Sequence, residues 1–311
     1  MAKRVANEKS NIEAINYRFL KTGGSSIVIG GYYYKDLLPI KEGKLIKLTK
    51  IIPNHNEFKH LDKIRKIDNY TEYYSIPDEL VRLLNPSETF YRTIKKLVMY
   101  DNLPIFDSPL HYFYIDDAGN KELLETLNDL YDKNYSFWTS YRKIFNFSKN
   151  IMEGLLFLHK KRICHLDIKP ENIMVNTITN KFKIIDFGFS SLEPFDDYIN
   201  NPKGTPGYYP KYYESVKVTK FFPKVKANDL VLVNNQIPML NNRKLVYKVD
   251  SYCFGRVLLC LKSMYKHNVT HCCINFEYTT TLKLNKIISS LLKNDVYQRV
   301  TIEKCYNRYF V

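Results

Sequence analysis

The sequence has no apolar run that approaches the length needed to span a bilayer, so a membrane-spanning protein is not expected. Its N-terminal stretch, MAKRVANEKSNIEAINYRF, has no apolar core of the signal-peptide type. None of its six cysteines forms a CxxC pair, and Cys253 and Cys260 fall in an apolar helical pattern. We therefore expect reduced core thiols in a soluble cytoplasmic protein, without a zinc site or a disulfide framework.

Acidic residues are scarce: 32 Asp and Glu stand against 47 Lys and Arg, which gives a formal net charge of +15. Such an excess favours acidic partners, among them nucleotide phosphates, acidic protein surfaces and nucleic acid. A compositional bias toward Lys, Tyr and Asn, with lysines on solvated faces, explains the same excess without any partner. No zinc spacing or basic-aromatic recognition motif supports nucleic-acid binding.

The most informative stretch is ICHLDIKPENIMVNTITNKFKIIDFG at 163–188. It places Asp167, Lys169 and Asn172 on one short loop, and Asp186 follows later in an Asp-Phe-Gly triplet. The intervening apolar runs, IMV and FKII, predict two strands of a hairpin, with the turn at 176–180. The stretch therefore predicts a loop, a short hairpin and a second loop, with polar side chains on both loops.

These residue types suit phosphoryl transfer. A carboxylate must orient an attacking hydroxyl and accept its proton, and an amine must neutralise the moving phosphoryl group. Amide and carboxylate oxygens are ligands that Mg²⁺ prefers. The stretch resembles the catalytic and metal-binding loops of eukaryotic-type serine/threonine protein kinases, which implies Asp167 as base, Lys169 as charge clamp, and Asn172 and Asp186 as metal ligands. The resemblance also implies ATP and Mg²⁺ as cofactors, with Mn²⁺ suited to the same ligands, and protein substrates.

The resemblance implies an α+β, two-lobed fold in one domain over 1–311, with a trimmed C-terminus. After a loose lead-in at 1–15, the small β-rich N-lobe would cover about 16–118 and the helical C-lobe about 119–311. An insertion near 215–248 would interrupt the C-lobe. Asp229 is the one acidic residue that opposes the basic residues of this insertion, which favours acidic substrates; a solvated basic loop without a partner explains the imbalance equally well. The basic residues are Lys217, Lys220, Lys224, Lys226, Arg243, Lys244 and Lys248.

The sequence from Tyr17 to Ile29 reads as a strand, a small-residue turn and a second strand. It resembles the kinase Gly-rich loop, although Thr22 and Ser26 replace the outer glycines; an ordinary hairpin turn explains it as well. The resemblance implies nucleotide contacts from Thr22, Gly23, Gly24, Ser25, Ser26 and Val28.

The next expected strand, from Lys44, offers two candidates for the lysine that contacts the ATP phosphates. Lys47 is our assignment and Lys50 its rival. The resemblance implies Glu57 as the partner of this lysine, although Glu57 also fits an ordinary surface position of a helix. The short gap between Lys47 and Glu57 further resembles kinases of large nucleocytoplasmic DNA viruses, which would place the protein in the host cytoplasm or the virion.

A buried-strand run, HYFYI at 111–115, corresponds to the hinge between lobes in this resemblance. The Asp116 carbonyl and the Ala118 N–H would meet the adenine edge, and Met174 is counted among the nucleotide-contacting residues. Helical patterns occur at 77–100, 122–130 and 138–160.

After the Asp-Phe-Gly triplet, GTPG at 204–207 resembles the substrate-docking end of an activation segment. The resemblance implies that Thr205 hydrogen-bonds Asp167 and Lys169, and that Glu214 pairs with Arg299. It also implies that Asp250, at the start of an apolar helix, holds the backbone at 165–166.

Alternatives remain from other classes. A pseudokinase or scaffold would bind partners without transfer, but it would not need four intact polar groups. A small-molecule phosphotransferase of related fold is a second alternative, against which the GTPG and KPEN segments argue.

Overall fold

A computed structural model of the protein describes the following residues: 16–22, 26–32, 44–49, 55–77, 82–84, 110–132, 137–196, 198, 204–210, 230–233, 237–240, 243–268 and 278–311. The chain divides into two compact units, Met1–Ile52 with Pro77–Asp117 and Pro53–Ile76 with Ala118–Val311. Among the described residues, the first unit contains a β-sheet and the second unit contains the helices. The fold is therefore α+β, as expected. Residues 53–76, assigned from sequence to the N-lobe, cluster with the second unit.

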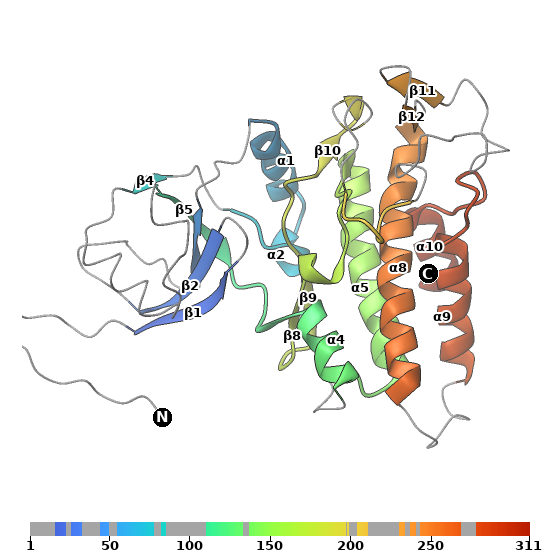
Figure 1. Ribbon diagram of the computed structural model, residues 1–311, viewed down its shortest axis with the longest axis horizontal. Coiled ribbons are helices and arrows are strands. Elements are labelled where there is room, and N and C mark those ends of the chain that lie inside the picture. The colour runs from blue at the N-terminus through green and yellow to red at the C-terminus, as the bar shows by residue number, and fades with distance from the viewer. Residues whose placement is uncertain are drawn as a thin grey trace, which may run out of the picture. The chain divides into compact units, whose positions relative to one another are not determined.

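The first unit contains a five-stranded antiparallel sheet in the order β1-β2-β3-β5-β4 (Figure 1). Its strands are β1 (Asn16–Thr22), β2 (Ser26–Tyr32), β3 (Lys44–Thr49), β4 (Arg82–Leu84) and β5 (Leu110–Asp116). The predicted hairpin is confirmed by the antiparallel pairing of β1 with β2, in which Thr22 lies opposite Ile27. The predicted strand at 111–115 is confirmed by β5.

The helices predicted within 77–100 are wrong for Arg82–Leu84, because these residues form the strand β4. Arg82 lies opposite Tyr112 and Leu84 opposite Leu110, so this short segment is an edge strand of the sheet. Pairing with β5 gives its backbone groups partners that the local sequence does not reveal, and a short apolar run cannot be assigned by periodicity alone. Residues 85–109 lie outside the described residues.

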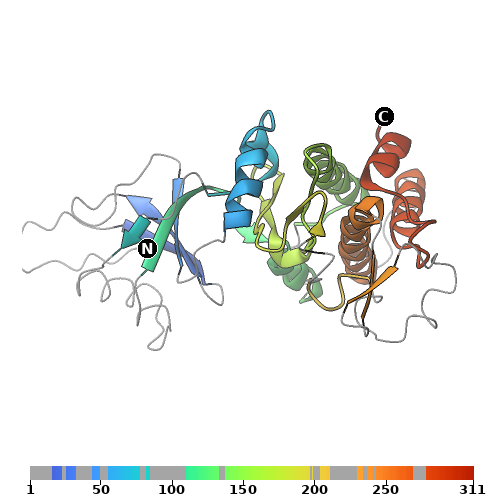
Figure 2. The ribbon, with the colours of Figure 1, turned by 90° about the horizontal axis from the view of Figure 1, so that it is seen from above.

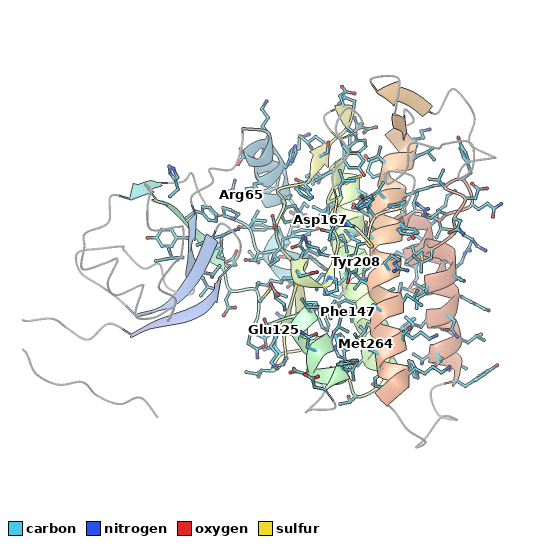
Figure 3. All side chains as sticks on the ribbon, in the orientation of Figure 1. Arg65, Glu125, Phe147, Asp167, Tyr208 and Met264 are labelled. Atoms are coloured by element: carbon cyan, nitrogen blue, oxygen red, sulfur yellow. The ribbon has the colours of Figure 1, made fainter. Side chains whose placement is uncertain are left out.

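The second unit is built on helices that run side by side (Figures 1 and 2). The described helices are α1 (His55–Arg65), α2 (Tyr70–Tyr73), α4 (Leu123–Tyr131), α5 (Tyr141–Lys160), η2 (Pro170–Asn172, a 3₁₀ turn), α8 (Arg243–Asn268), α9 (Tyr278–Leu291) and α10 (Ile302–Tyr309). Side chains fill the space between them (Figure 3). The patterns at 122–130 and 138–160 are confirmed by α4 and α5.

Helix α5 shows why this sequence folds as it does. The Ser140 side chain caps its first turn by accepting a hydrogen bond from Lys143 N at 3.1 Å. Apolar side chains then recur at helical spacing, and Phe147 packs against Phe254 of α8 with ring centroids 6.0 Å apart. The buried face of α5 thereby joins α8 in one core.

Short strands carry the predicted loops. β6 (Lys121–Glu122), β8 (Ile173–Asn176) and β9 (Lys181–Ile184) form one sheet, and β7 (Ile163–Cys164) pairs with β10 (Ser191–Leu192). The hairpin predicted between the two polar loops is confirmed by β8 and β9. A separate hairpin consists of β11 (Leu230–Val233) and β12 (Ile237–Leu240).

The predicted insertion at 215–248 is described only in part. From Arg243 onward the chain belongs to α8. Lys248 Nζ donates to the carbonyls of Val296 and Tyr297 at 2.8 and 3.1 Å, and burial, together with the charge of Arg299, lowers the pKa of Lys248. Lys248 therefore holds the C-terminal segment in place and does not belong to a solvated basic loop.

Two sequence expectations on composition can be compared with the described residues. Cys164, Cys253, Cys260 and Cys305 are free thiols, as predicted, and three of them are buried. Cys272 and Cys273 lie outside the described residues. Among the helices that the structure describes, none combines the length and apolar character that crossing a membrane requires.

Candidate active site

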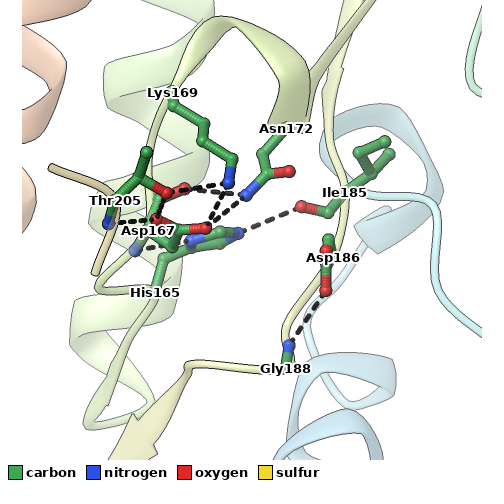
Figure 4. Close-up of polar contacts among 8 residues, drawn as sticks. All are labelled: His165, Asp167, Lys169, Asn172, Ile185, Asp186, Gly188 and Thr205. Carbon is green, nitrogen blue, oxygen red and sulfur yellow. Dashed lines mark hydrogen bonds and ion pairs between the residues drawn. The ribbon is translucent and has the colours of Figure 1, made fainter. Parts of the chain in front are cut away.

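Asp167 is the centre of a cluster of polar side chains on the loop between β7 and β8 (Figure 4). Asp167 as a whole is only 6% exposed. Oδ1 accepts hydrogen bonds from Thr205 N at 3.0 Å and from Thr205 Oγ1 at 2.7 Å. Oδ2 accepts from Asn172 Nδ2 at 3.0 Å and lies 3.0 Å from Lys169 Nζ. The orientation of this carboxylate is thus fixed from three sides.

Lys169 and Thr205 complete this cluster. Lys169 Nζ donates to Thr205 Oγ1 at 2.8 Å. Because the Thr205 hydroxyl donates its own proton to Asp167, the three side chains form a closed ring of contacts. These hydrogen bonds agree with those expected of Thr205 from the sequence. They place one cationic amine directly beside the buried carboxylate.

Asn172 and Asp186 offer oxygen atoms of the kind that bind Mg²⁺. Asn172 Nδ2 donates to both the carbonyl and the carboxylate of Asp167, so its Oδ1 is turned away from that carboxylate (Figure 4). Asp186 is exposed, with a backbone φ of 63°, and its Oδ1 accepts from Gly188 N at 3.2 Å. The amide oxygen and the accessible carboxylate fit a hard divalent cation.

His165 connects the two loops. Asp167 N donates to His165 Nδ1 at 3.3 Å, so the ring proton lies on Nε2, which donates to the carbonyl of Ile185 at 3.1 Å. The same ring lies 4.9 Å from the ring of Phe187. Sequence reasoning assigned no side-chain role to His165, although its place two residues before Asp167 was a usable signal.

Asp250 is a buried hub beneath the catalytic loop. Its carboxylate accepts from His165 N at 2.9 Å and from Leu166 N at 2.7 Å, which confirms the predicted contacts. It also meets His159 Nε2 at 2.8 Å, a contact that sequence reasoning missed. Burial by itself raises the pKa of the Asp250 carboxyl. The hydrogen bonds from His159 and Leu166 lower that pKa by more, so the net shift is downward. The hub therefore remains ionised.

Cys164 lies beside this hub. Burial and the neighbouring Asp250 charge raise the pKa of the Cys164 thiol well above its usual value, so the thiol stays protonated.

The sheet of the first unit aligns Phe113 with two residues that are predicted to contact the nucleotide, Val28 and Lys47. Val28 lies opposite Lys47, and Lys47 lies opposite Phe113, so all three share one face of the sheet. Lys47 Nζ lies 5.6 Å from the centroid of the Phe113 ring. Asp116, at the end of β5, binds Lys44 Nζ through its carboxylate at 2.6 Å. These contacts fix the strand register on which the Lys47 assignment depends.

Comparison with known proteins identifies the family. Residues 103–311, more than half of the chain, match the protein kinase domain. The chain belongs to this family. The match begins at residue 103, so the predicted phosphate-binding hairpin and Lys47 lie outside the matched range, and their roles stay predictions.

Similar curated proteins are serine/threonine kinases. The chain is 26% identical over 205 residues to an Aurora kinase of Candida glabrata, which covers 61% of this chain and 47% of that protein. It is 44% identical over 63 residues to myosin light chain kinase 2 of Homo sapiens, covering 20% and 11%. It is 44% identical over 61 residues to serine/threonine-protein kinase chk1 of Schizosaccharomyces pombe, covering 19% and 12%. The chain thus aligns with less than half the length of each relative.

Several predicted residues of this kinase domain cannot be placed with their side chains. Gly23, Gly24, Ser25, Lys50 and Glu214 lie outside the described residues, as do the side chains of Thr22, Ser26 and Glu57. Lys47 and Glu57 belong to different units, and their pairing stays a prediction. Ala118 is buried and Met174 half-buried, the latter on β8 opposite Glu122.

Two arginines of the kinase domain make contacts that were not predicted from the sequence. The predicted pairing of Arg299 with Glu214 stays a prediction, because Glu214 lies outside the described residues. Arg299 is fully buried; its guanidinium lies over the Tyr252 ring at 4.7 Å and donates to the Lys293 carbonyl. Arg256 of α8 donates to the carbonyl of Gly207 at 3.0 Å and so holds the segment that follows Thr205. Arg256 lies six residues beyond the predicted Asp250 on α8, but its partner is 49 residues away and could not be inferred.

Proposed function

We propose that this chain is an ATP-dependent serine/threonine protein kinase. The observation that carries the proposal is the Asp167 carboxylate, which is held by Thr205 and Asn172 while Lys169 lies 3.0 Å from it. This combination provides a proton acceptor and a positive charge at one point, as phosphoryl transfer to a hydroxyl requires.

In the proposed reaction, Asp167 orients the substrate hydroxyl and accepts its proton as the oxygen attacks the γ-phosphoryl group, while the bond from that group to ADP breaks and ADP leaves. Lys169 neutralises charge that develops on the transferred group. The Thr205 hydroxyl holds the Asp167 carboxylate and the Lys169 amine next to each other, because it donates to the first and accepts from the second. Catalysis then comes mainly from positioning and from preorganised charge.

Asn172 and Asp186 would hold Mg²⁺, with Mn²⁺ as a substitute on the same oxygen ligands. A cation held by these two residues would neutralise negative charge on the ATP phosphates. We also propose that residues 22–26, Val28 and Lys47 bind the phosphates and the adenine, together with Asp116, Ala118 and Met174. Catalytic roles for Asp167, Lys169 and Thr205 are part of the same proposal.

The test is a transfer assay with labelled ATP, Mg²⁺ and a panel of acidic and basic acceptor proteins. We expect label on serine and threonine, with faster labelling of acidic acceptors because of the net charge of +15. Equal labelling of acidic and basic acceptors would contradict the acidic-substrate proposal alone. No labelling of any acceptor, with ATP binding retained, would favour the pseudokinase alternative, which the four polar groups and the kinase relatives disfavour.

A cytoplasmic location is proposed from the free thiols among the described cysteines. The proposal of a large DNA virus as the source, with the host cytoplasm or the virion as location, rests on the short gap between Lys47 and Glu57 and on the helix-poor sequence around Pro53. The relatives named above are from yeasts and a mammal and give it no support.

Replacing Lys47 by alanine is expected to lower kcat/KM by about a hundredfold to a thousandfold, the effect of losing one preorganised charged contact. Lys50→Ala is the matched control and should have a mild effect. The measurement is steady-state kinetics at varied ATP concentration. A larger defect for Lys50→Ala than for Lys47→Ala would reverse the assignment of the phosphate lysine.

We expect activity that does not depend on phosphorylation of the activation segment. The residue before Asp167 is Leu166, which is fully buried and has no charge that a phosphate would need to neutralise. Four described hydroxyl residues of the segment are also engaged or buried: Ser190 donates to the Phe187 carbonyl, Thr205 donates to Asp167, and Ser191 and Tyr198 are buried.

Protein made in bacteria and treated with phosphatase should therefore keep most of its activity in the transfer assay. The control is the same protein preincubated with ATP and Mg²⁺ before the assay. A large loss on phosphatase treatment that preincubation restores would show that another basic residue captures a phosphate.

A further inference from the structure

A polar contact joins α1 to the turn that follows Asp186, and neither partner has a role in the proposed reaction. His60 Nδ1 lies 2.8 Å from Ser190 Oγ, although the two residues are 130 positions apart. His60 is only 5% exposed, on a helix that otherwise buries Leu61 and Ile64. A polar ring in this position needs a partner, and an apolar residue would fill the same space without one.

The direction of this hydrogen bond follows from the bonds around Ser190. A hydroxyl has one proton, and Ser190 Oγ donates it to the Phe187 carbonyl at 2.6 Å. Ser190 Oγ therefore accepts from His60, and the proton lies on Nδ1 of His60. Because an imidazolium also carries a proton on Nδ1, the contact survives protonation of the ring.

The contact continues to the predicted metal ligand. The Phe187 carbonyl accepts a second bond from Ser190 N at 2.9 Å, which closes a turn over 187–190. Asp186 precedes this turn with φ at 63°, a left-handed conformation that its surroundings must maintain. Its carboxylate accepts from Gly188 N, inside the turn (Figure 4). A change in the turn would thus alter the direction of the Asp186 carboxylate.

We infer that His60 is a positioning residue for Asp186: its Nδ1–H holds Ser190, Ser190 holds the 187–190 turn, and the turn aims the carboxylate at the divalent cation. The inference rests on the proposed function, since it assigns Mg²⁺ to Asp186. It predicts that the loss of the His60 donor weakens Mg²⁺ binding while the rate at saturating Mg²⁺ changes little.

The experiment compares three variants that distinguish the donor position. In His60→Asn, an amide N–H can occupy the place of Nδ1. In His60→Gln, the amide reaches the place of Nε2 and the donor to Ser190 is lost. Ser190→Ala removes the acceptor in a small side chain that the fold tolerates. Lys59→Ala, at the exposed neighbouring position on α1, is the control.

Two readouts are measured over a range of Mg²⁺ concentrations. One is the thermal midpoint in the presence of the β,γ-imido analogue of ATP, and the other is the transfer rate. We expect the Mg²⁺ concentration at half-effect to rise about tenfold in His60→Gln and Ser190→Ala, the lower end for residues that orient a metal ligand. His60→Asn should restore most of the wild-type value, and Lys59→Ala should match it.

Unchanged half-effect concentrations in folded Ser190→Ala, or equal shifts in His60→Asn and His60→Gln, would overturn the inference. If all variants transfer phosphate with one Mg²⁺ dependence, the proposed function stands and the positioning role fails. If the variants show the expected Mg²⁺ shifts in the thermal assay but neither they nor the wild type transfer phosphate, the proposed function fails and the positioning role stands. A wild type without any Mg²⁺ response would overturn both.

Discussion

Replacing Asp167 by asparagine is expected to lower kcat by about 10²- to 10⁴-fold, the contribution of a positioned general base. The amide cannot accept the proton of the attacking hydroxyl. It also places an N–H₂ group against hydrogen-bond donors, because Oδ2 of Asp167 receives Asn172 Nδ2 and Lys169 Nζ, and Oδ1 receives Thr205. The measurement is the initial rate of label transfer at saturating ATP and Mg²⁺.

The matched control is Asp68→Asn, the same chemical change at an exposed carboxylate of the same unit. It should leave both the rate and the thermal midpoint unchanged. Asp167→Asn should stay folded, because its carboxylate lies on a loop. Near-normal transfer by a folded Asp167→Asn variant would contradict the base assignment.

Replacing Asp250 by alanine is expected to lower the free energy of unfolding by about 3–5 kcal/mol, since buried hydrogen-bond donors lose their acceptor. The donors left behind are the backbone N–H groups of His165 and Leu166 and the ring of His159. The catalytic loop should lose its position as well, so activity should fall along with stability. Denaturant unfolding and the transfer assay measure the two effects.

Asp250→Asn removes the negative charge but keeps nearly the same side-chain shape, so it measures the effect of the charge alone. One amide oxygen can still serve Leu166, but the N–H₂ group then opposes the donor of His165, so a smaller loss of stability than in Asp250→Ala is expected. A loss in both variants no larger than in Asp68→Asn would contradict the hub role of Asp250.

The pH dependence of this difference has a defined sign. The folded-state pKa of Asp250 is lowered, so its carboxylate adds stability that is fully present above the unfolded pKa, about 3.9 for an ordinary Asp. That contribution is lost as the pH falls toward the folded pKa. The stability gap between wild type and Asp250→Asn should therefore shrink below about pH 4, as measured by unfolding at several pH values. A gap that widens with acid would contradict the ionised hub.

Much of the local structure could be predicted from the sequence because local patterns determine it. The strands β5, β8 and β9 and the helices α4 and α5 all carry periodic apolar residues bounded by turn or capping residues. The polar set Asp167, Lys169 and Asn172 could be found because all three lie on one loop.

Other features depend on partners distant in the chain. β4 is a strand because β5 pairs with it, and residues 53–76 cluster with the second unit because Leu61 and Tyr74 join its core. A strand of three residues is too short for its apolar pattern to reveal such a pairing. The contacts of His159 with Asp250 and of His60 with Ser190 were missed for the same reason.

The sequence by itself determined the chemistry of the loops, because residue type and spacing along one loop decide which groups can meet across a few bonds. Only the tertiary structure decided how those groups are held. Asp167 accepts a hydrogen bond from Thr205, which is 38 residues away in the sequence. The backbone N–H of Leu166 donates to Asp250, which is 84 residues away. Residues so far apart in the sequence come into contact only when α5, α8 and the short strands bury their apolar faces together. That burial compensates the loss of chain entropy on folding.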